Sequence, residues 1–281
     1  MPELPEVEIT ARRIGAATAG ATVQSTLAPG LNALKTYDPP ISQLEGRRVV
    51  RVRRRGKLFL LDLEDELTLL IHLMSAGRLQ LFDQRASLRD RTSRFLLRLE
   101  DGPELRLREF GTKQRAWVKL LRSPEVERDE MLSALGPEAW PDPPDFAPLL
   151  DAPRPLHTLL RDQHVIAGIG RSWVDEILHA ARLSPFKRGA DLDAGEAGRL
   201  RTATIEQLGA AIAHYEQVIA LPIPDKLPMP LKVHRRQGEP CPRCGERLEA
   251  VFYEDYVMSY CPACQTEGKL LKDRRLSRLL R

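Results

Sequence analysis

Hydrophobic positions follow two different patterns along the chain. Residues 7–20 have a helical pattern that ends at Gly20, so they predict one helix. Short β-type runs follow at residues 21–26, 48–54, 58–63, 67–72, 94–99, 104–108 and 115–121. Several short strands at close spacing, some separated by turn signals such as Asp101-Gly102, predict a sandwich-like or barrel-like β domain that follows one helix.

The second half of the chain predicts helices. A proline-rich passage at residues 137–155 interrupts the strand pattern and predicts a linker between domains. Residues 156–166 and 171–181 predict two helices joined by a glycine turn, and residues 192–218 predict a further helix or two. A glycine turn of this kind lets a phosphate approach backbone amides at a helix start, although a Gly-x-Gly turn alone is weak evidence. Prolines between residues 222 and 230 mark another linker.

The charge distribution points to phosphate backbones more than the net charge does. The chain of 281 residues has a formal net charge of +4, which alone says little. Basic residues crowd two segments, residues 47–57 and the tail at 269–281. Such clusters are typical of nucleic-acid contacts, and a solvated face is the equally weighted alternative.

The sequence predicts a cytoplasmic protein. It has no apolar run of membrane length, and its start is acidic and proline-bearing, unlike a secretory signal. The four cysteines all lie near the C-terminal end, as the pairs Cys241/Cys244 and Cys261/Cys264. In a reducing compartment this spacing predicts one structural Zn²⁺ held by four thiolates, in preference to redox chemistry or unmetallated thiols. The hairpin between the pairs, roughly residues 248–260, is expected to touch DNA.

The first residues carry candidate chemistry. Removal of the initiator methionine leaves Pro2 with a secondary amine, and α-amino groups have a pKa of about 7.7–8.0, so a sizeable fraction is unprotonated at neutral pH. An unprotonated amine can attack an electrophilic sugar carbon and form an iminium, with Glu3 near enough to shuttle a proton. Pro5, Glu6 and Glu8 favour a helix start. The alternative is a frayed terminus with Pro-Glu capping.

Four motifs in order resemble the formamidopyrimidine-DNA glycosylase / endonuclease VIII family of base-excision repair enzymes. They are PELPEVE at residues 2–8, RRGKLFL at 54–60, the turn Gly168-Ile169-Gly170, and GEPC at 238–241. The resemblance implies an α+β multidomain fold: an N-terminal helix plus β-sandwich catalytic domain at 1–136, a linker at 137–155, a helix-two-turn-helix DNA-binding domain at 156–231, a zinc-finger ribbon at 232–268, and the basic tail at 269–281.

The resemblance also implies residue roles. Pro2 looks like the nucleophile that attacks C1′ of the damaged nucleotide, and Glu3 looks like the acid/base. Lys57 looks like the residue that assists glycosidic cleavage and contacts phosphate, with an ordinary surface lysine as the alternative, and Glu6 matches an acidic residue that supports the pocket. The target base must be flipped out of the helix to be reached. Implied DNA-binding positions are Lys57, Met74, Arg94, Phe110, Gly168, Gly170, Arg171, Lys232 and His234.

Several positions depart from the family pattern. Arg171 stands where an asparagine is usual, Tyr256 where the zinc hairpin carries an arginine, and His157 where a lysine precedes the turn. Tyr256 weakens the hairpin's phosphate clamp and puts efficient δ-elimination in doubt. Met74 is displaced by one residue from the family's void-filling methionine; Met74 and Phe110 are either apolar wedges or core residues.

The segment before the ribbon bears on the substrate. Family members that excise 8-oxoguanine usually carry a longer glycine-rich loop here, which caps the flipped purine. Residues 219–231 are short and proline-rich, so they are expected to be stiff. This argues against a standard 8-oxoguanine cap, whereas the start motif favours the purine branch, so oxidised purines and oxidised pyrimidines both stay open.

The expected function is a bifunctional DNA glycosylase and AP lyase, a hydrolase and lyase that removes oxidised bases through a Schiff base at Pro2 and nicks the strand. The alternative is a non-excising, or AP-lyase-only, damage-binding protein of the same fold. A third interpretation, a zinc-ribbon protein acting on RNA, would need stacking aromatics in places where this sequence lacks them. The expected partner is double-stranded DNA with damaged bases or abasic sites, bound by a monomer that joins the nucleoid when on DNA and has no membrane partner.

Overall fold

The structure is a computed structural model that describes residues 2–87, 90–100, 102–110 and 113–272. Residues 273–281 of the expected basic tail lie outside the described residues. Contacts divide the chain into two units, which we call the N-terminal unit, Met1–Ala134 with Ile212–Pro228, and the helix–ribbon unit, Leu135–Ala211 with Met229–Arg281. Residues 212–228, which the sequence analysis assigned to the helical domain at 156–231, thus group with the N-terminal unit.

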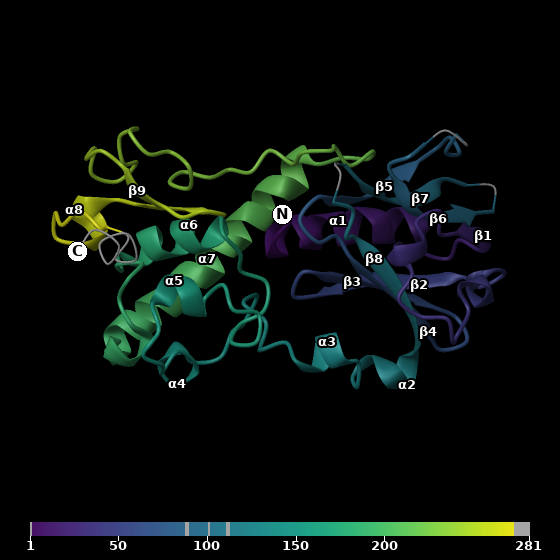
Figure 1. Ribbon diagram of the computed structural model, residues 1–281, viewed down its shortest axis with the longest axis horizontal. Helices are drawn as coiled ribbons and strands as arrows, with labels where there is room; N and C mark the ends of the chain where they lie inside the picture. The colour runs from purple at the N-terminus through teal and green to yellow at the C-terminus, as the bar shows by residue number, and fades with distance from the viewer. Residues whose placement is uncertain (1, 88–89, 101, 111–112, 273–281) are drawn as a thin grey trace. The chain divides into compact units, whose positions relative to one another are not determined.

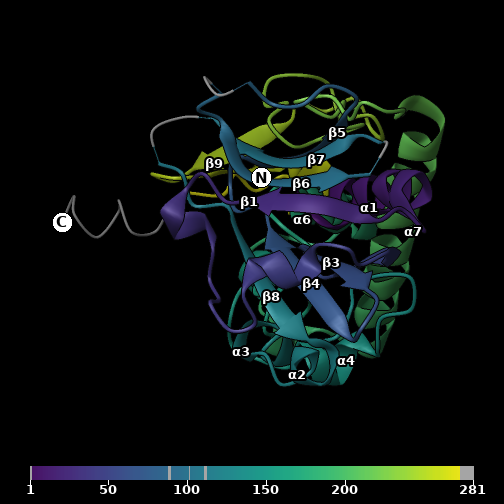
Figure 2. The same cartoon turned by 90° about the vertical axis from the view of Figure 1, so that its right-hand side faces the viewer.

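The N-terminal unit contains the long helix α1, which spans Leu4–Thr18, and two four-stranded antiparallel sheets (Figure 1). One sheet has the order β1 (Val23–Leu27), β6 (Ser93–Leu99), β7 (Glu104–Glu109), β5 (Gly77–Phe82). The other has the order β2 (Val49–Arg55), β3 (Leu58–Leu63), β4 (Leu67–His72), β8 (Trp117–Arg122). Figure 2 shows the two sheets as two layers. Short helices occur at η1 (Leu31–Ala33), η2 (Ile41–Leu44), α2 (Ser123–Val126) and α3 (Glu130–Ser133).

One hydrophobic core joins these elements. The inward side chains of both sheets meet in it, for example Phe59 of β3 and Phe95 of β6. Helix α1 adds Val7, Ala11 and Ile14, which recur on one helical face. Alternate residues of the strands and one face of α1 contribute to this single core. The core therefore confirms the predicted β-sandwich preceded by one helix.

Strand β5 was not predicted from the sequence. Its signal is the alternation of Leu79 and Leu81, which are buried, with Arg78 and Gln80. The strand pairs with β7 in unbroken register from Gly77 to Phe82. A Cβ on Gly77 would lie 2.3 Å from the Leu73 carbonyl oxygen, so only glycine fits the tight turn that opens the strand.

The helix–ribbon unit contains the helices α4 (Phe146–Leu149), α5 (Leu156–Leu159), α6 (Trp173–Ala181), η3 (Gly189–Asp191) and most of α7 (Ala194–Val218). Strands β9 (Glu249–Phe252) and β10 (Val257–Tyr260) form the ribbon hairpin, followed by α8 (Pro262–Gln265). The predicted helix at 156–166 is wrong beyond Leu159, because Asp162 starts a turn there and accepts the His164 amide hydrogen. Residues 192–218 form one helix rather than two, and its last turns from Ile212 belong to the N-terminal unit.

The described residues include no helix that combines the length and the apolarity needed to cross a bilayer.

Candidate active site and zinc ribbon

The start of α1 holds two acidic residues that the sequence analysis singled out. Glu3 is the residue before the helix and Glu6 lies in its first turn, and both are buried. The backbone N–H of Glu3 donates to Glu6 Oε2 at 2.9 Å, as part of a capping box between the two residues. Pro2 precedes Glu3 directly and is half-buried. The backbone that follows Pro2 is therefore fixed by the Glu6 carboxylate.

The second oxygen of Glu6 is held by a residue that sequence reasoning missed. The Tyr215 hydroxyl donates to Glu6 Oε1 at 2.7 Å, and the tyrosine is fully buried. Burial and then the charge of Glu6 raise the pKa of the Tyr215 phenol, so the hydroxyl keeps its proton and acts as a donor. Nothing in the sequence links a tyrosine on α7 to a carboxylate that lies 209 residues before it.

Two arginines fasten the end of α7 to α1. Arg13 donates to the Ile219 carbonyl at 2.8 Å and to the Glu216 carbonyl at 2.6 Å. Arg12 donates to Glu216 Oε1 at 2.8 Å. Because Tyr215 lies in this same turn, these contacts help to fix its hydroxyl against Glu6.

Lys57 lies in a two-residue turn between β2 and β3, where Arg55 pairs with Leu58 and Gly56 has a φ of 55°. The strand that leads into this turn is tied to α1, since Arg54 Nε donates to Glu8 Oε2 at 2.7 Å with an Arg54 side chain only 6% exposed. Pro2, Glu3, Glu6 and Lys57 thus all belong to the N-terminal unit, on α1 and the hairpin packed against it.

His72 lies across the β3–β4 pair from Leu58. Burial and then the charge of Lys57 lower the pKa of His72 to about 4, so its imidazole is neutral at pH 7. The shift also indicates that the Lys57 ammonium is close enough to act on this ring.

The basic cluster at residues 47–57 is largely balanced by acidic residues. Ion pairs join Arg47 to Asp65, Arg48 to Glu64, Arg51 and Arg53 to Asp62, and Arg54 to Glu8. These five arginines therefore carry internal partners, and the alternative of a solvated, ion-paired face accounts for them without DNA.

The segment before the ribbon is bound to the sheet of the N-terminal unit. We call residues 219–228 the strap. Gln80 Nε2 donates to the Ile223 carbonyl at 2.6 Å and to Asp225 Oδ1 at 3.1 Å. Arg108 Nη1 lies 3.3 Å from Asp225 Oδ1, and Arg78 donates to the Asp225 carbonyl. The strap is thus held by side chains of β5 and β7, in line with the stiffness expected from its prolines.

Three expected DNA-binding residues of this unit differ in exposure. Phe110 is 38% exposed and lies beside the Arg108 guanidinium, 4.7 Å from its ring centroid. Met74 is half-buried in a turn with a φ of 51°. Arg94 is buried, and its guanidinium donates to Gln114 Oε1 at 2.9 Å and to Asn32. Arg94 therefore has partners inside the unit, and these contacts explain its burial without DNA.

In the helix–ribbon unit, a glutamine fixes the glycine turn. Gln163 Oε1 accepts the Gly168 amide hydrogen at 2.9 Å, and its Nε2 donates to the Ile169 carbonyl at 2.8 Å. Gly168 has a φ of 111°, which side-chain-bearing residues rarely adopt, and Gly170 follows with a buried backbone. The turn leads directly into α6 at Trp173.

Arg171 after this turn contacts the ribbon hairpin. Its guanidinium pairs with Asp255 at 2.6 Å and lies 5.5 Å from the Tyr256 ring centroid. Arg161 lies 4.3 Å from the same ring, and Tyr253 stacks on it at 4.3 Å. Tyr256, where the family pattern has an arginine, is therefore a platform for two arginines.

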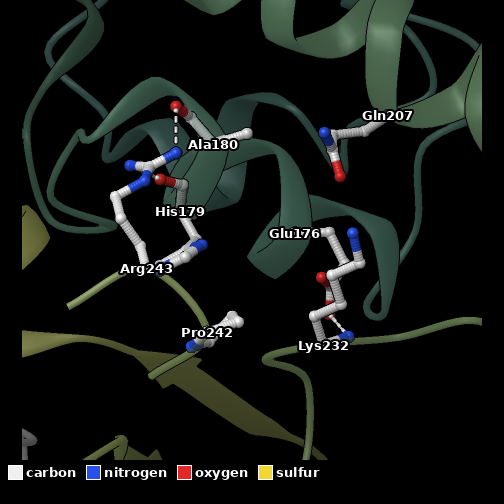
Figure 3. Close-up of a pocket in the computed structure, with 7 residues that line it drawn as sticks. All are labelled: Glu176, His179, Ala180, Gln207, Lys232, Pro242 and Arg243. Atoms are coloured by element: carbon white, nitrogen blue, oxygen red, sulfur yellow. Dashed lines mark hydrogen bonds between the residues drawn. The ribbon is translucent and has the colours of Figure 1, made fainter. Parts of the chain in front are cut away.

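The entry to the ribbon is anchored on α6. Glu176 Oε1 accepts the backbone N–H groups of Lys232, Val233 and His234 at 2.8–3.1 Å, and burial raises its pKa. His234 Nδ1 lies 2.7 Å from Asp175 Oδ2, so this predicted DNA-binding residue has an internal partner. Figure 3 shows Glu176 and Lys232 across a pocket of about 180 Å³ from Arg243.

Arg243 lies within the first cysteine pair and contacts the end of α6. It donates to the carbonyls of His179 at 3.0 Å and Ala180 at 3.2 Å (Figure 3). A cation at this position meets the last carbonyls of the helix, of which that of His179 also accepts the Arg182 backbone N–H. The contacts of Glu176 and Arg243 thus join the ribbon to α6 on two sides.

The four cysteine sulfurs fit a tetrahedral metal site. All four lie within 4.8 Å of one another. The distance between the Cys241 and Cys264 sulfurs is 3.9 Å, and that between the Cys244 and Cys261 sulfurs is 3.5 Å. Zinc–sulfur bonds of about 2.3 Å in a tetrahedron separate the sulfurs by about 3.8 Å. The donor set therefore suits Zn²⁺, as expected from the sequence, and four thiolates leave no open position for catalysis.

Comparisons with known proteins agree with this fold. Residues 1–113 match the model of the formamidopyrimidine-DNA glycosylase N-terminal domain, and residues 138–221 match that of the formamidopyrimidine-DNA glycosylase H2TH domain. The formamidopyrimidine-DNA glycosylase of Thermus thermophilus is 34% identical over 294 residues, covering 95% of this chain and 100% of the relative. The chain belongs to the formamidopyrimidine-DNA glycosylase family.

Solved structures show the same fold. A Lactococcus lactis Fpg in complex with DNA containing an abasic site superimposes with a TM-score of 0.84 at 26% identity, over 94% of this chain and 99% of that one. A MutM in complex with DNA containing carbocyclic 8-oxo-G gives a TM-score of 0.83 at 26% identity, over 94% of this chain and 100% of that one. These matches confirm the expected helix, sandwich and H2TH architecture.

Proposed function

We propose that this protein is a DNA glycosylase with AP lyase activity, which removes oxidised bases from DNA and nicks the strand through an iminium at Pro2. The observation that carries the proposal is the buried hydrogen-bonded start of α1, where Glu6 holds the backbone next to Pro2. Membership of the glycosylase family supports base excision, and the lyase step rests on the chemistry of an N-terminal secondary amine.

In this mechanism the Pro2 amine, freed by removal of Met1, attacks C1′ of the flipped nucleotide as the base departs. Glu3 opens the deoxyribose ring and moves protons during the elimination that follows. The Lys57 ammonium stabilises the negative charge that develops as the base departs, and it also contacts a neighbouring phosphate. The turn that carries Lys57 is tied to α1 by the Arg54–Glu8 ion pair, which supports a joint role for these residues.

The proposed DNA contacts extend over both units. In the helix–ribbon unit we assign phosphate binding to the backbone at Gly168 and Gly170 and to the Arg171 side chain, with the Tyr256 platform supporting its guanidinium. A Zn²⁺ ion held by the four cysteines would stabilise the ribbon that carries Tyr256. In the N-terminal unit, Phe110 is the better exposed candidate wedge.

Borohydride trapping tests the proposal. Protein confirmed by mass to begin at Pro2 is mixed with duplexes that carry an abasic site, 8-oxoguanine, a formamidopyrimidine or an oxidised pyrimidine. We expect a covalent adduct with the abasic duplex, and the lesion that reacts first identifies the preferred substrate. The same chain with an uncleaved N-terminal tag is the matched control and is expected to give no adduct.

Two outcomes would overturn the proposal. An adduct of equal yield from the tagged chain would mean that another residue is the nucleophile. Tight binding to the abasic duplex without any adduct would favour a damage-binding protein that does not excise. Arg171 and Tyr256, which depart from the family pattern, are the residues that favour this alternative.

A further inference from the structure

We infer that Tyr215 is a positioning residue for the reaction, which holds Glu6 and through it the backbone at Glu3, so that α1 presents Pro2 in a single arrangement. This inference rests on the proposed function and names a residue that the sequence motifs of α1 do not include. It concerns a hydrogen bond that joins a side chain of α7 to the first turn of α1.

Geometry carries the inference. Glu6 has both carboxylate oxygens engaged, one by the Tyr215 hydroxyl at 2.7 Å and the other by the Glu3 backbone N–H at 2.9 Å. The carboxylate is therefore a rigid link between the α7 side chain and the backbone immediately after Pro2. A rotation of the Glu6 side chain would break both contacts together.

The surroundings of Tyr215 make it a fixed donor. The side chain is fully buried, and its turn of α7 is fastened to α1 through Arg13, which donates to the carbonyls of Glu216 and Ile219. The raised pKa of the phenol keeps the hydroxyl protonated at neutral pH, so it donates to Glu6 throughout the working range. A charged acceptor makes this hydrogen bond stronger than one between neutral groups.

The hydroxyl of Tyr215 has a role that is separate from the packing of its ring, because only the hydroxyl donates to Glu6. A phenylalanine at position 215 would keep the aromatic ring and its packing, but would remove this donor from a buried carboxylate. Glu6 would then adopt more than one orientation, and the Glu3 backbone would lose its fixed acceptor. Small displacements of reacting groups lower the rate of a chemical step strongly without the same effect on ground-state binding.

The experiment compares the wild-type chain with Tyr215→Phe, each confirmed to begin at Pro2. Single-turnover rates of base excision and of borohydride trapping are measured at saturating protein, and the Kd is measured for a duplex that carries a tetrahydrofuran abasic analogue. We expect both rates to fall by at least about tenfold while the Kd changes by less than about twofold.

The matched control is Thr18→Val, which removes another buried hydroxyl from the N-terminal unit. The Thr18 hydroxyl donates to the Ile14 carbonyl at 2.8 Å at the far end of α1. We expect this variant to retain the wild-type rates. Thermal unfolding of both variants shows whether the loss of rate exceeds what a comparable loss of stability produces.

The outcomes separate this inference from the proposed function. Wild-type rates in Tyr215→Phe, or a Kd that rises by the same factor as the rates fall, would overturn the positioning role alone. Equal rate losses in Tyr215→Phe and Thr18→Val would also overturn it, because the effect would then be one of stability. Absence of any adduct in the wild-type chain would overturn both the proposed function and this inference.

Discussion

At the scale of single residues, the proposed chemistry depends on a few buried polar side chains. Glu6 is the clearest case, because its two oxygens connect the end of α7 to the start of α1. Burying a carboxylate is unfavourable unless hydrogen bonds compensate for lost hydration, and here a phenol and a backbone amide do so. These two hydrogen bonds hold the Glu6 carboxylate in one orientation, which agrees with its proposed place beside Pro2.

His72 gives a prediction at this scale, because its pKa is lowered to about 4 in the folded protein from an ordinary value of 6.5. Between pH 6.5 and 4 the unfolded chain binds a proton that the folded chain does not, so the free energy of unfolding falls as the pH falls through this window. We expect His72→Gln to lower the proton uptake on unfolding by up to about one proton.

The measurement is a series of urea unfolding curves from pH 4 to pH 7 for both proteins. Other titrating groups contribute equally to the two chains, so the difference in slope isolates His72. Identical slopes would mean that the imidazole titrates alike in the folded and unfolded states, and would remove the argument that Lys57 and burial act on it.

At the scale of elements, the sequence pattern was most accurate where a continuous apolar run forms a strand that is buried on both faces. The predicted strands at 58–63 and 67–72 match β3 and β4, since nearly every side chain in them is buried. Strand β5 was missed although its leucines alternate with polar positions. Arg78 and Gln80 contact the strap, and Gln80 also accepts a hydrogen bond from Arg108 of β7. The helix at 156–166 ended early because Asp162 offers its backbone a local alternative.

The ribbon gives a prediction at the element scale. Its core is divided into two small clusters, one of the cysteines with Val233 and Leu248, and one of Val251, Met258 and Tyr260 in the hairpin. Such a module depends on its metal for folding. We expect Cys244→Ser, or treatment with a chelator, to weaken binding to abasic-site DNA sharply, as measured by fluorescence anisotropy.

Restoring zinc to chelated wild-type protein is the control, and it should recover the affinity. Cys244→Ser should not respond to added zinc in the same way, since it lacks one of the four thiolates. Unchanged affinity after removal of the metal would show that the ribbon contributes nothing to DNA binding.

At the scale of the whole molecule, the net charge is mildly basic, and the arginines differ in how firmly acidic partners hold them. Arg51, Arg53 and Arg54 of β2 are paired with acidic neighbours, so much of the strand that looked like a DNA surface is locally balanced. Arg171, by contrast, lies at the glycine turn against the Tyr256 platform, with a partner, Asp255, that is 68% exposed. An exposed ion pair is weak, so Arg171 can exchange this partner for a phosphate at little cost.

The dependence of DNA affinity on salt tests this distinction. We expect log K to fall linearly with log salt concentration, and Arg171→Ala to reduce the magnitude of the slope by about one. Arg53→Ala is the matched control, because Arg53 is paired with Asp62, whose side chain is only 11% exposed, and its removal is expected to leave the slope unchanged. Binding is measured at four or more salt concentrations. Equal slopes for wild type and Arg171→Ala would exclude a phosphate contact by this residue.

The sequence by itself determined the features that depend on neighbouring residues: the helix after Pro2, the alternation of the sandwich strands, the glycine turn and the two cysteine pairs. It also supplied the motif from which the family was recognised. Only the tertiary structure decided that Tyr215 donates to Glu6, that the strap is bound by Gln80, and that Arg94 and His234 have internal partners. The physical reason is that periodicity and residue chemistry act over a few positions, whereas these contacts form only when packing brings distant segments of the chain together.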